Sequence, residues 1–94
     1  MEYLISEATA TKLREKHFVF PDEVIECFEN QMKDAIEDTR EEHLSYPPTL
    51  WFIADTNVGR RLKVVFIQIS ENKIVIRTAY PPDEIEEEMY EQAT

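Results

Sequence analysis

Residues 59–80, GRRLKVVFIQISENKIVIRTAY, decide the fold, because two runs rich in valine and isoleucine flank the dipeptide Glu71-Asn72. β-Branched residues favour strands, and asparagine tolerates the positive φ of a tight turn. The stretch therefore predicts a β-hairpin. LWFIAD, at residues 50–55, precedes it across the turn TNVGR and supplies another strand, so the sequence predicts a three-stranded antiparallel meander.

The register of the hairpin determines which side chains reach the core. A two-residue turn at Glu71-Asn72 predicts four cross-strand pairs: Lys63 with Tyr80, Phe66 with Arg77, Ile67 with Ile76, and Ile69 with Ile74. One face then holds the β-branched residues expected in the core, which are Val65, Ile67, Ile69, Ile74 and Ile76. The opposite face holds Val64, Phe66, Gln68, Val75 and Arg77. A slip of one residue in either strand would exchange the two faces.

Helices are expected before and after the meander in the chain. Ser6 is a good N-cap for a helix that runs to about Lys16 and has Leu13 as its apolar anchor. Pro21 suits the first turn of a second helix, which runs to about Asn30. Its apolar face comprises Val24, Ile25, Phe28 and Met32. Pro82 begins a C-terminal helix in which apolar residues recur at every fourth position: Ile85, Met89 and Ala93.

Residues 31–43 have two interpretations. They continue the second helix through Ala35 and Ile36, or they turn into a short edge strand, and the sequence does not decide between these alternatives. Pro47 and Pro48 mark a break, because paired prolines continue neither a helix nor a central strand. The pattern predicts one α+β domain over residues 1–94, with two N-terminal helices, the meander and a C-terminal helix.

Charge is segregated along this chain. The net charge is −10, yet residues 49–80 carry five basic and two acidic side chains, which gives +3. Residues 21–48 carry two basic and nine acidic side chains, and residues 81–94 carry six acidic and no basic ones. A uniformly acidic chain would argue against nucleic-acid binding, because phosphate neutralisation supplies most non-specific affinity. Segregated charge makes that argument weaker.

Several classes of protein and site lack their sequence signals. The apolar runs are far shorter than the ~20 residues of a membrane helix, and residues 1–6 lack the pattern of a secretion signal. We therefore expect a cytoplasmic protein without membrane partners. Cys27 is the only cysteine and is expected to be a small buried hydrophobe. His17 and His43 have no Cys or His beside them, so no zinc site is predicted, and no motif indicates a cofactor.

Other charged residues have competing interpretations. Arg77 interrupts an apolar strand, so it forms a salt bridge to a helix carboxylate or binds a ligand. Arg60 and Arg61 follow a turn and are expected to be solvated charges at a strand entrance. The glutamates of the last helix are expected to form an exposed face: Glu84, Glu86, Glu87 and Glu88.

Two segments resemble the BrnT-type toxins. KLREKHFVFPDEVIECFEN, at residues 12–30, is similar to the helix, Lys-His-Gly-Val and second helix that open these proteins. Residues 59–91 are similar to their run of Gly-Arg, strand, turn, strand and closing helix with Tyr-Glu. The resemblance implies a RelE/ParE-like fold, with a curved antiparallel sheet of three to four strands flanked by helices. It favours an edge strand near residues 35–39.

The resemblance also implies a function and residues for it. It implies a metal-independent ribonuclease that blocks translation and is neutralised by an antitoxin from a neighbouring gene. Lys16 and His17 match the family's Lys-His, Arg60 matches the arginine after the turn glycine, and the terminal Tyr-Glu is Tyr90 and Glu91. Two positions depart from the pattern: Phe18 replaces the glycine after the histidine, and Tyr80 stands where many relatives place an arginine.

Two functions are therefore expected as alternatives. A ribonuclease would use Arg60, Arg61 and Arg77 as cations for the phosphorane, and His17 or Tyr80 to move protons. Lys16, Arg61 and Lys63 would bind its substrate, which is RNA or the ribosome. The alternative is a catalytically inactive, acidic protein-binding module on the same fold, favoured by the net charge and by Tyr80. The expected assemblies are a homodimer or a hetero-oligomer with the antitoxin.

Overall fold

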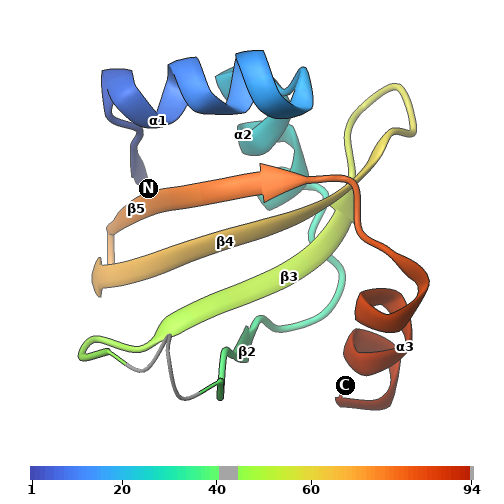
Figure 1. Cartoon of the computed structure of the whole chain (residues 1–94). Coiled ribbons are helices and arrows are strands. Elements are labelled where there is room, and N and C mark those ends of the chain that lie inside the picture. Colours follow the sequence, from blue (N-terminus) through green and yellow to red (C-terminus); the bar gives the residue numbers. More distant parts are fainter. Residues whose placement is uncertain (41–44, 94) are drawn as a thin grey trace.

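The computed structural model describes residues 1–40 and 45–93 and is an α+β fold (Figure 1). Its elements in chain order are β1 (Glu2–Leu4), α1 (Glu7–Lys12), the π-helical segment η1 (Leu13–His17), α2 (Pro21–Glu29), β2 (Ile36–Glu37), β3 (Thr49–Asp55), β4 (Arg61–Ser70), β5 (Lys73–Tyr80) and α3 (Glu84–Ala93). The strands form one mixed sheet in the order β1-β5-β4-β3-β2. Among the described residues, no helix has both the length and the apolar character needed to cross a membrane.

The predicted meander is confirmed as β3, β4 and β5, which pair antiparallel. Ile36 and Glu37 form the short edge strand β2 beside β3, so the strand interpretation holds for these two residues. Positions 41–43 of the ambiguous segment, and His43 with them, lie outside the described residues. The strand β1 is not predicted by the sequence. It pairs parallel to β5, which turns the expected antiparallel sheet into a mixed one.

Of the four predicted cross-strand pairs of the hairpin, the three nearer the turn are wrong. Lys63 does lie opposite Tyr80, but Phe66 lies opposite Ile76 instead of Arg77. The register shifts leave Arg77 and Ile69 without an opposite residue, which is the arrangement of β-bulges. Ile67 therefore pairs with Val75 rather than Ile76, and Gln68 rather than Ile69 pairs with Ile74.

This shift of one residue exchanges the two faces of β4. The residues of β4 that are buried against the helices are Leu62, Val64 and Phe66. The predicted core residues Val65 and Ile67 are only partly buried, and Ile69 is 46% exposed. Ile74 and Ile76 of β5 are buried as predicted. The bulged strand is β5, in which Ile76 and Ala79, on either side of Arg77, are both buried. The alternation of β4 continues without interruption from Leu62 to Phe66, so the bulge changes which of its residues share a face with Ile74 and Ile76.

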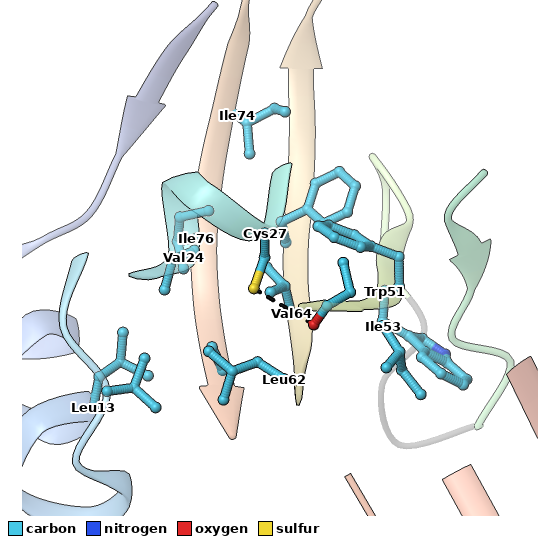
Figure 2. Packing of buried hydrophobic residues seen from close by; sticks show 14 of the residues in the cluster. Leu13, Val24, Cys27, Trp51, Ile53, Leu62, Val64, Ile74 and Ile76 are labelled. Atoms are coloured by element: carbon cyan, nitrogen blue, oxygen red, sulfur yellow. Dashed lines mark hydrogen bonds between the residues drawn. The ribbon is translucent and has the colours of Figure 1, made fainter. Parts of the chain in front are cut away.

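The segments α1, η1 and α2 cover one face of the sheet, and the main core lies beneath them (Figure 1). Ser6 caps α1 as predicted, because its hydroxyl accepts a hydrogen bond from the Thr9 N–H at 3.0 Å. Cys27 is fully buried, and its thiol donates to the Ala54 carbonyl at 3.6 Å (Figure 2). Burial raises the pKa of this thiol to about 12, so Cys27 is the inert core residue that was expected.

The opposite face of the sheet, here called the open face, is covered at one end by α3. The Tyr90 ring lies 5.6 Å from the Trp51 ring, and its hydroxyl donates to the carbonyls of Lys33 and Asp34. The predicted apolar side of this helix does not face the core, since Ile85 is 69% and Met89 is 53% exposed. Instead, α3 rests on the sheet through Tyr90 and through ion pairs described below.

The register makes a testable prediction, because Ile76 and Ile69 are both expected in the core from sequence but only Ile76 is buried. Ile76→Ala should lower the free energy of unfolding by about 3 kcal/mol, since it removes buried methyl groups and leaves a cavity. Ile69→Ala should cost about 1 kcal/mol or less, because this side chain is half exposed. Urea denaturation measures both values, and equal losses would contradict the bulged register.

Candidate functional site

Lys63 lies at the centre of a cluster on the open face. Its side chain is only 6% exposed, and its ammonium lies 2.7 Å from the Glu86 carboxylate. The same nitrogen lies 4.4 Å from the centroid of the Trp51 ring and 5.6 Å from that of Tyr80. A carboxylate and two aromatic faces thus replace the water that this charge loses on burial. We refer to Trp51, Lys63, Tyr80 and Glu86 as the Lys63 cluster.

Glu86 connects the cluster to the start of α3. Its Oε2 accepts from Lys63 and also from the Tyr80 hydroxyl, at 2.7 Å each. Its Oε1 accepts from the Asp83 N–H at 3.1 Å, while its own N–H donates to the Asp83 carboxylate at 2.8 Å. This reciprocal pair is a capping box, which fixes the first turn of α3 and aims Glu86 at the sheet.

The cluster sets the protonation states of its two acids. Burial raises the pKa of Tyr80, and the hydrogen bond to Glu86 raises it further. Burial alone would also raise the pKa of Glu86, but hydrogen bonds from Lys63, the Asp83 N–H and Tyr80 together lower it. At neutral pH, Tyr80 is therefore a protonated donor and Glu86 is a charged acceptor. Neither group is a ready general base.

His17 approaches this cluster from η1. It is the last residue of the helical segment, and the centroid of its ring lies 5.5 Å from that of the Tyr80 ring. The structure thus brings together three residues predicted for the site, His17, Lys63 and Tyr80, from distant parts of the sequence. Lys16, the neighbour of His17, is exposed.

Arg60 has a structural contact network, so its prediction as a solvated charge is wrong. Its guanidinium donates to the carbonyls of His17 and Phe18, at 2.8 and 2.7 Å, where η1 ends. It also pairs with Glu23 at 3.3 Å, and Glu23 accepts in turn from the Phe20 N–H. Arg60 therefore holds the end of η1 against the start of α2. The guanidinium N–H groups that a phosphate would need are thus already bound to protein oxygens.

Phe18 has the backbone conformation that favours glycine. Its φ is 54°, in the left-handed region, and its side chain is 74% exposed. Helices often end in this conformation, most often with glycine, because a Cβ is strained there. This is the position at which the resemblance to the BrnT-type toxins places a glycine.

Arg61 and the glutamates of α3 are also paired. Arg61 forms two hydrogen bonds to the Glu87 carboxylate, at 2.6 and 2.8 Å, and lies 3.3 Å from Asp55. The expectation of an exposed face is therefore wrong for Glu86 and Glu87, which attach α3 to β4, whereas Glu84 and Glu88 are exposed as expected. Arg77 is exposed at its bulge, and no carboxylate pairs with it within residues 1–40 and 45–93.

A groove opens beside the Lys63 cluster, between β2 and α3. Its volume is about 530 Å³. Its apolar lining includes Ile36, Trp51, Met89 and Ala93, and its polar lining includes Asp38, Arg40, Lys63 and Glu86. Asp38 is nearly buried and accepts from the Arg40 guanidinium at 2.8 Å. The groove has no signal in the sequence, because its walls come from segments that are remote in the chain.

The geometry of the site provides hydrogen-bond donors and aromatic ring faces. In the described part of the chain, no three histidine, cysteine or acidic side chains are grouped closely enough to hold a metal ion. No protein-family model matches the chain, and no curated protein is significantly similar to it.

Replacing Phe18 tests the strain at the end of η1. Phe18→Gly should raise the free energy of unfolding by about 0.5–1 kcal/mol, because glycine adopts positive φ without strain and little buried surface is lost. Phe20→Gly is the control, since Phe20 has φ of −107° and gains nothing from glycine. Phe20→Gly should therefore lower the free energy of unfolding. If Phe18→Gly lowers it as well, the backbone at Phe18 is not strained and the prediction is contradicted.

Replacing Glu86 tests the buried ion pair. Glu86→Gln should lower the free energy of unfolding at neutral pH by about 2 kcal/mol, because the Lys63 ammonium stays buried without a countercharge. The pKa of Glu86 is lowered by folding, so its contribution is present above its ordinary pKa of 4.5 and is lost as the pH falls below that value.

The stability difference between wild type and Glu86→Gln should therefore shrink as the pH falls below 4.5. Glu91→Gln is the matched control, because Glu91 is exposed and no ion pair is described for it. It should change the free energy of unfolding by less than about 0.5 kcal/mol. Denaturation curves at several pH values measure both differences, and a gap for Glu86→Gln that does not change with pH would contradict the role given to the pair.

Proposed function

We propose that this chain is a catalytically inactive, acidic protein-binding module. The observation that carries this proposal is the pairing of its cations. Arg60 pairs with Glu23, Arg61 with Glu87, and Lys63 with Glu86. A ribonuclease needs cations aimed at the charge that develops on the phosphorane. Here, three of the basic residues expected to serve RNA are neutralised by carboxylates of the same chain.

The same pairing changes the surface that a partner meets. Three of the five basic side chains of residues 49–80 pair with acids of α2 and α3, while the net charge of the chain stays at −10. A field of this sign repels the nucleic-acid backbone and attracts a basic protein surface. We therefore propose a basic protein as the partner, such as an antitoxin encoded by a neighbouring gene, in a cytoplasmic hetero-oligomer.

We also propose that the fold is RelE/ParE-like and that the chain is a divergent relative of the BrnT-type toxins. Two helical segments before a meander, the edge strand β2 and a closing helix support this relation. The left-handed backbone at Phe18 supports the alignment of Lys16 and His17 with the family's Lys-His-Gly. One difference from the expected antiparallel sheet is the added strand β1, which pairs parallel with β5. Tyr80, in place of an arginine, contributes a hydroxyl to Glu86 and no positive charge.

One observation favours the second candidate, a metal-independent ribonuclease. His17 lies beside Tyr80, so a histidine and a protonated hydroxyl are adjacent, and these are groups that acid–base cleavage of RNA requires. In such an enzyme His17 would accept the 2′ hydroxyl proton and Tyr80 would protonate the leaving oxygen. Arg77 and Lys16, both exposed, would supply the cations.

Inducible expression in a bacterial host distinguishes the two functions. We expect cells that express the wild type or His17→Ala to grow equally and to keep their messenger RNA intact. Purified protein should also fail to retain RNA in a filter-binding assay at low salt, where phosphate contacts are strongest. Growth arrest with RNA cleavage, relieved by His17→Ala or Arg77→Ala, would overturn the proposal in favour of the ribonuclease.

A further inference from the structure

The helix α3 presents apolar side chains to solvent. Ile85 and Met89 lie one turn apart and are 69% and 53% exposed, and Ala93, one turn later, is also exposed. The side of α3 that meets the sheet carries Glu86, Glu87 and Tyr90 instead. Ion pairs and one aromatic contact therefore hold the helix, and its apolar stripe stays available.

This stripe continues into the groove beside β2. Met89 and Ala93 form one wall, while Ile36 and Trp51 extend the apolar lining over the sheet. The volume of about 530 Å³ lies within the range of ~300–1,000 Å³ in which proteins hold ligands or anchoring side chains. The stripe and the groove thus form one continuous apolar surface, which we call the α3 groove.

Exposed acidic side chains lie on both sides of the α3 groove. Glu88, the residue before Met89, is exposed on α3, as are Glu84 and Glu91 farther round the helix, and none of the three has an ion-pair partner within residues 1–40 and 45–93. Glu37 of β2 is exposed on the other side. The C-terminal end of α3 adds the negative end of a helix dipole. The two cations that line the groove do not offset this acidic charge, because Lys63 pairs with Glu86 and Arg40 pairs with Asp38.

Charge and geometry select one occupant. A second copy of this chain also carries −10 and is repelled, as is nucleic acid. An added β-strand would find a poor template, since β2 has only two residues. The occupant must bring an apolar surface for the groove and positive charge for the glutamates beside it. An amphipathic helix provides both, because its apolar side fits a groove while lysine and arginine on its flanks meet the glutamates. We propose that the α3 groove docks an amphipathic, basic helix of a partner protein, an inference that rests on the proposed binding function.

Titration of the isotope-labelled full chain with a synthetic peptide tests the inference by NMR. The peptide has about 18 residues, or five helical turns, with leucine at positions i, i+3, i+4 and i+7 and lysine elsewhere. We expect saturable binding, with chemical-shift changes concentrated at Ile36, Trp51, Ile85 and Met89. A peptide of the same composition in scrambled order should bind at least ~10-fold more weakly, and a peptide with glutamate in place of lysine should not bind.

Two variants of this chain locate the site. Met89→Glu should weaken binding of the amphipathic peptide at least ~10-fold, because it places a charge in the apolar stripe. Met32→Glu is the matched control, since Met32 is 95% exposed and does not line the groove, and its affinity should equal that of the wild type. Circular dichroism checks that both variants keep the wild-type helix content and melting temperature.

Equal binding of the scrambled peptide, shift changes on α1 and α2, or undiminished affinity of Met89→Glu would each overturn the α3 groove as the docking site. Lack of binding to every peptide would overturn it as well. These results leave the proposed function in place, because that function depends on the growth and RNA assays. Conversely, RNA cleavage in those assays would refute the proposed function whatever the peptides do.

Discussion

Burial of the Lys63 ammonium on β4 is the constraint on which the arrangement of the open face depends. A charge with a side-chain exposure of 6% is stable only with a countercharge, and Glu86 is the carboxylate that reaches it. The capping box with Asp83 aims Glu86 at the sheet and so fixes where α3 begins. Tyr90, one turn later, then contacts Trp51. The position of α3 therefore follows from the ion pairs of Glu86 and Glu87 and from the contact between Tyr90 and Trp51.

The same pair explains why the apolar stripe of α3 is exposed. In a helix, residues three and four positions apart share a side. Glu86 and Tyr90 point at the sheet, so Ile85 and Met89, each one position earlier, are rotated away from it. A helix held by its apolar stripe would instead have buried Met89 and exposed Glu86. The ion pairs thus decide both the orientation of α3 and the surface that it offers.

Local signals in the sequence predicted the elements well. Ser6 and Pro21 mark helix starts by their own chemistry, and Glu71-Asn72 marks a turn. The start predicted at Pro82 is two residues early, because Asp83 caps α3 and the helix begins at Glu84. The hairpin register was not predictable in the same way, because the bulges at Arg77 and Ile69 depend on how the strands pack against other segments. The strand β1 was missed because three residues carry no pattern of their own.

The candidate site was predictable only in part. His17, Tyr80 and Lys63 were identified from sequence and do lie together. The roles of Glu86 and Arg60 were not foreseen, since each depends on contacts across the fold. One signal was present: Lys63 precedes Val65 by two positions, so a charge shares a face with apolar side chains and needs a partner. The partner itself could not be chosen from among 20 acidic residues.

The parallel pairing of β1 with β5 has a consequence for how the protein folds. Glu2 lies opposite Lys73, so the pairing joins segments 71 positions apart (73 − 2) in a chain of 94 residues. Contacts between remote segments close large loops and slow the search for the native state. During synthesis, β1 leaves the ribosome long before its neighbour in the sheet exists. β1 must therefore wait until β5, about 70 positions later, has been synthesised before it acquires its hydrogen-bond partners.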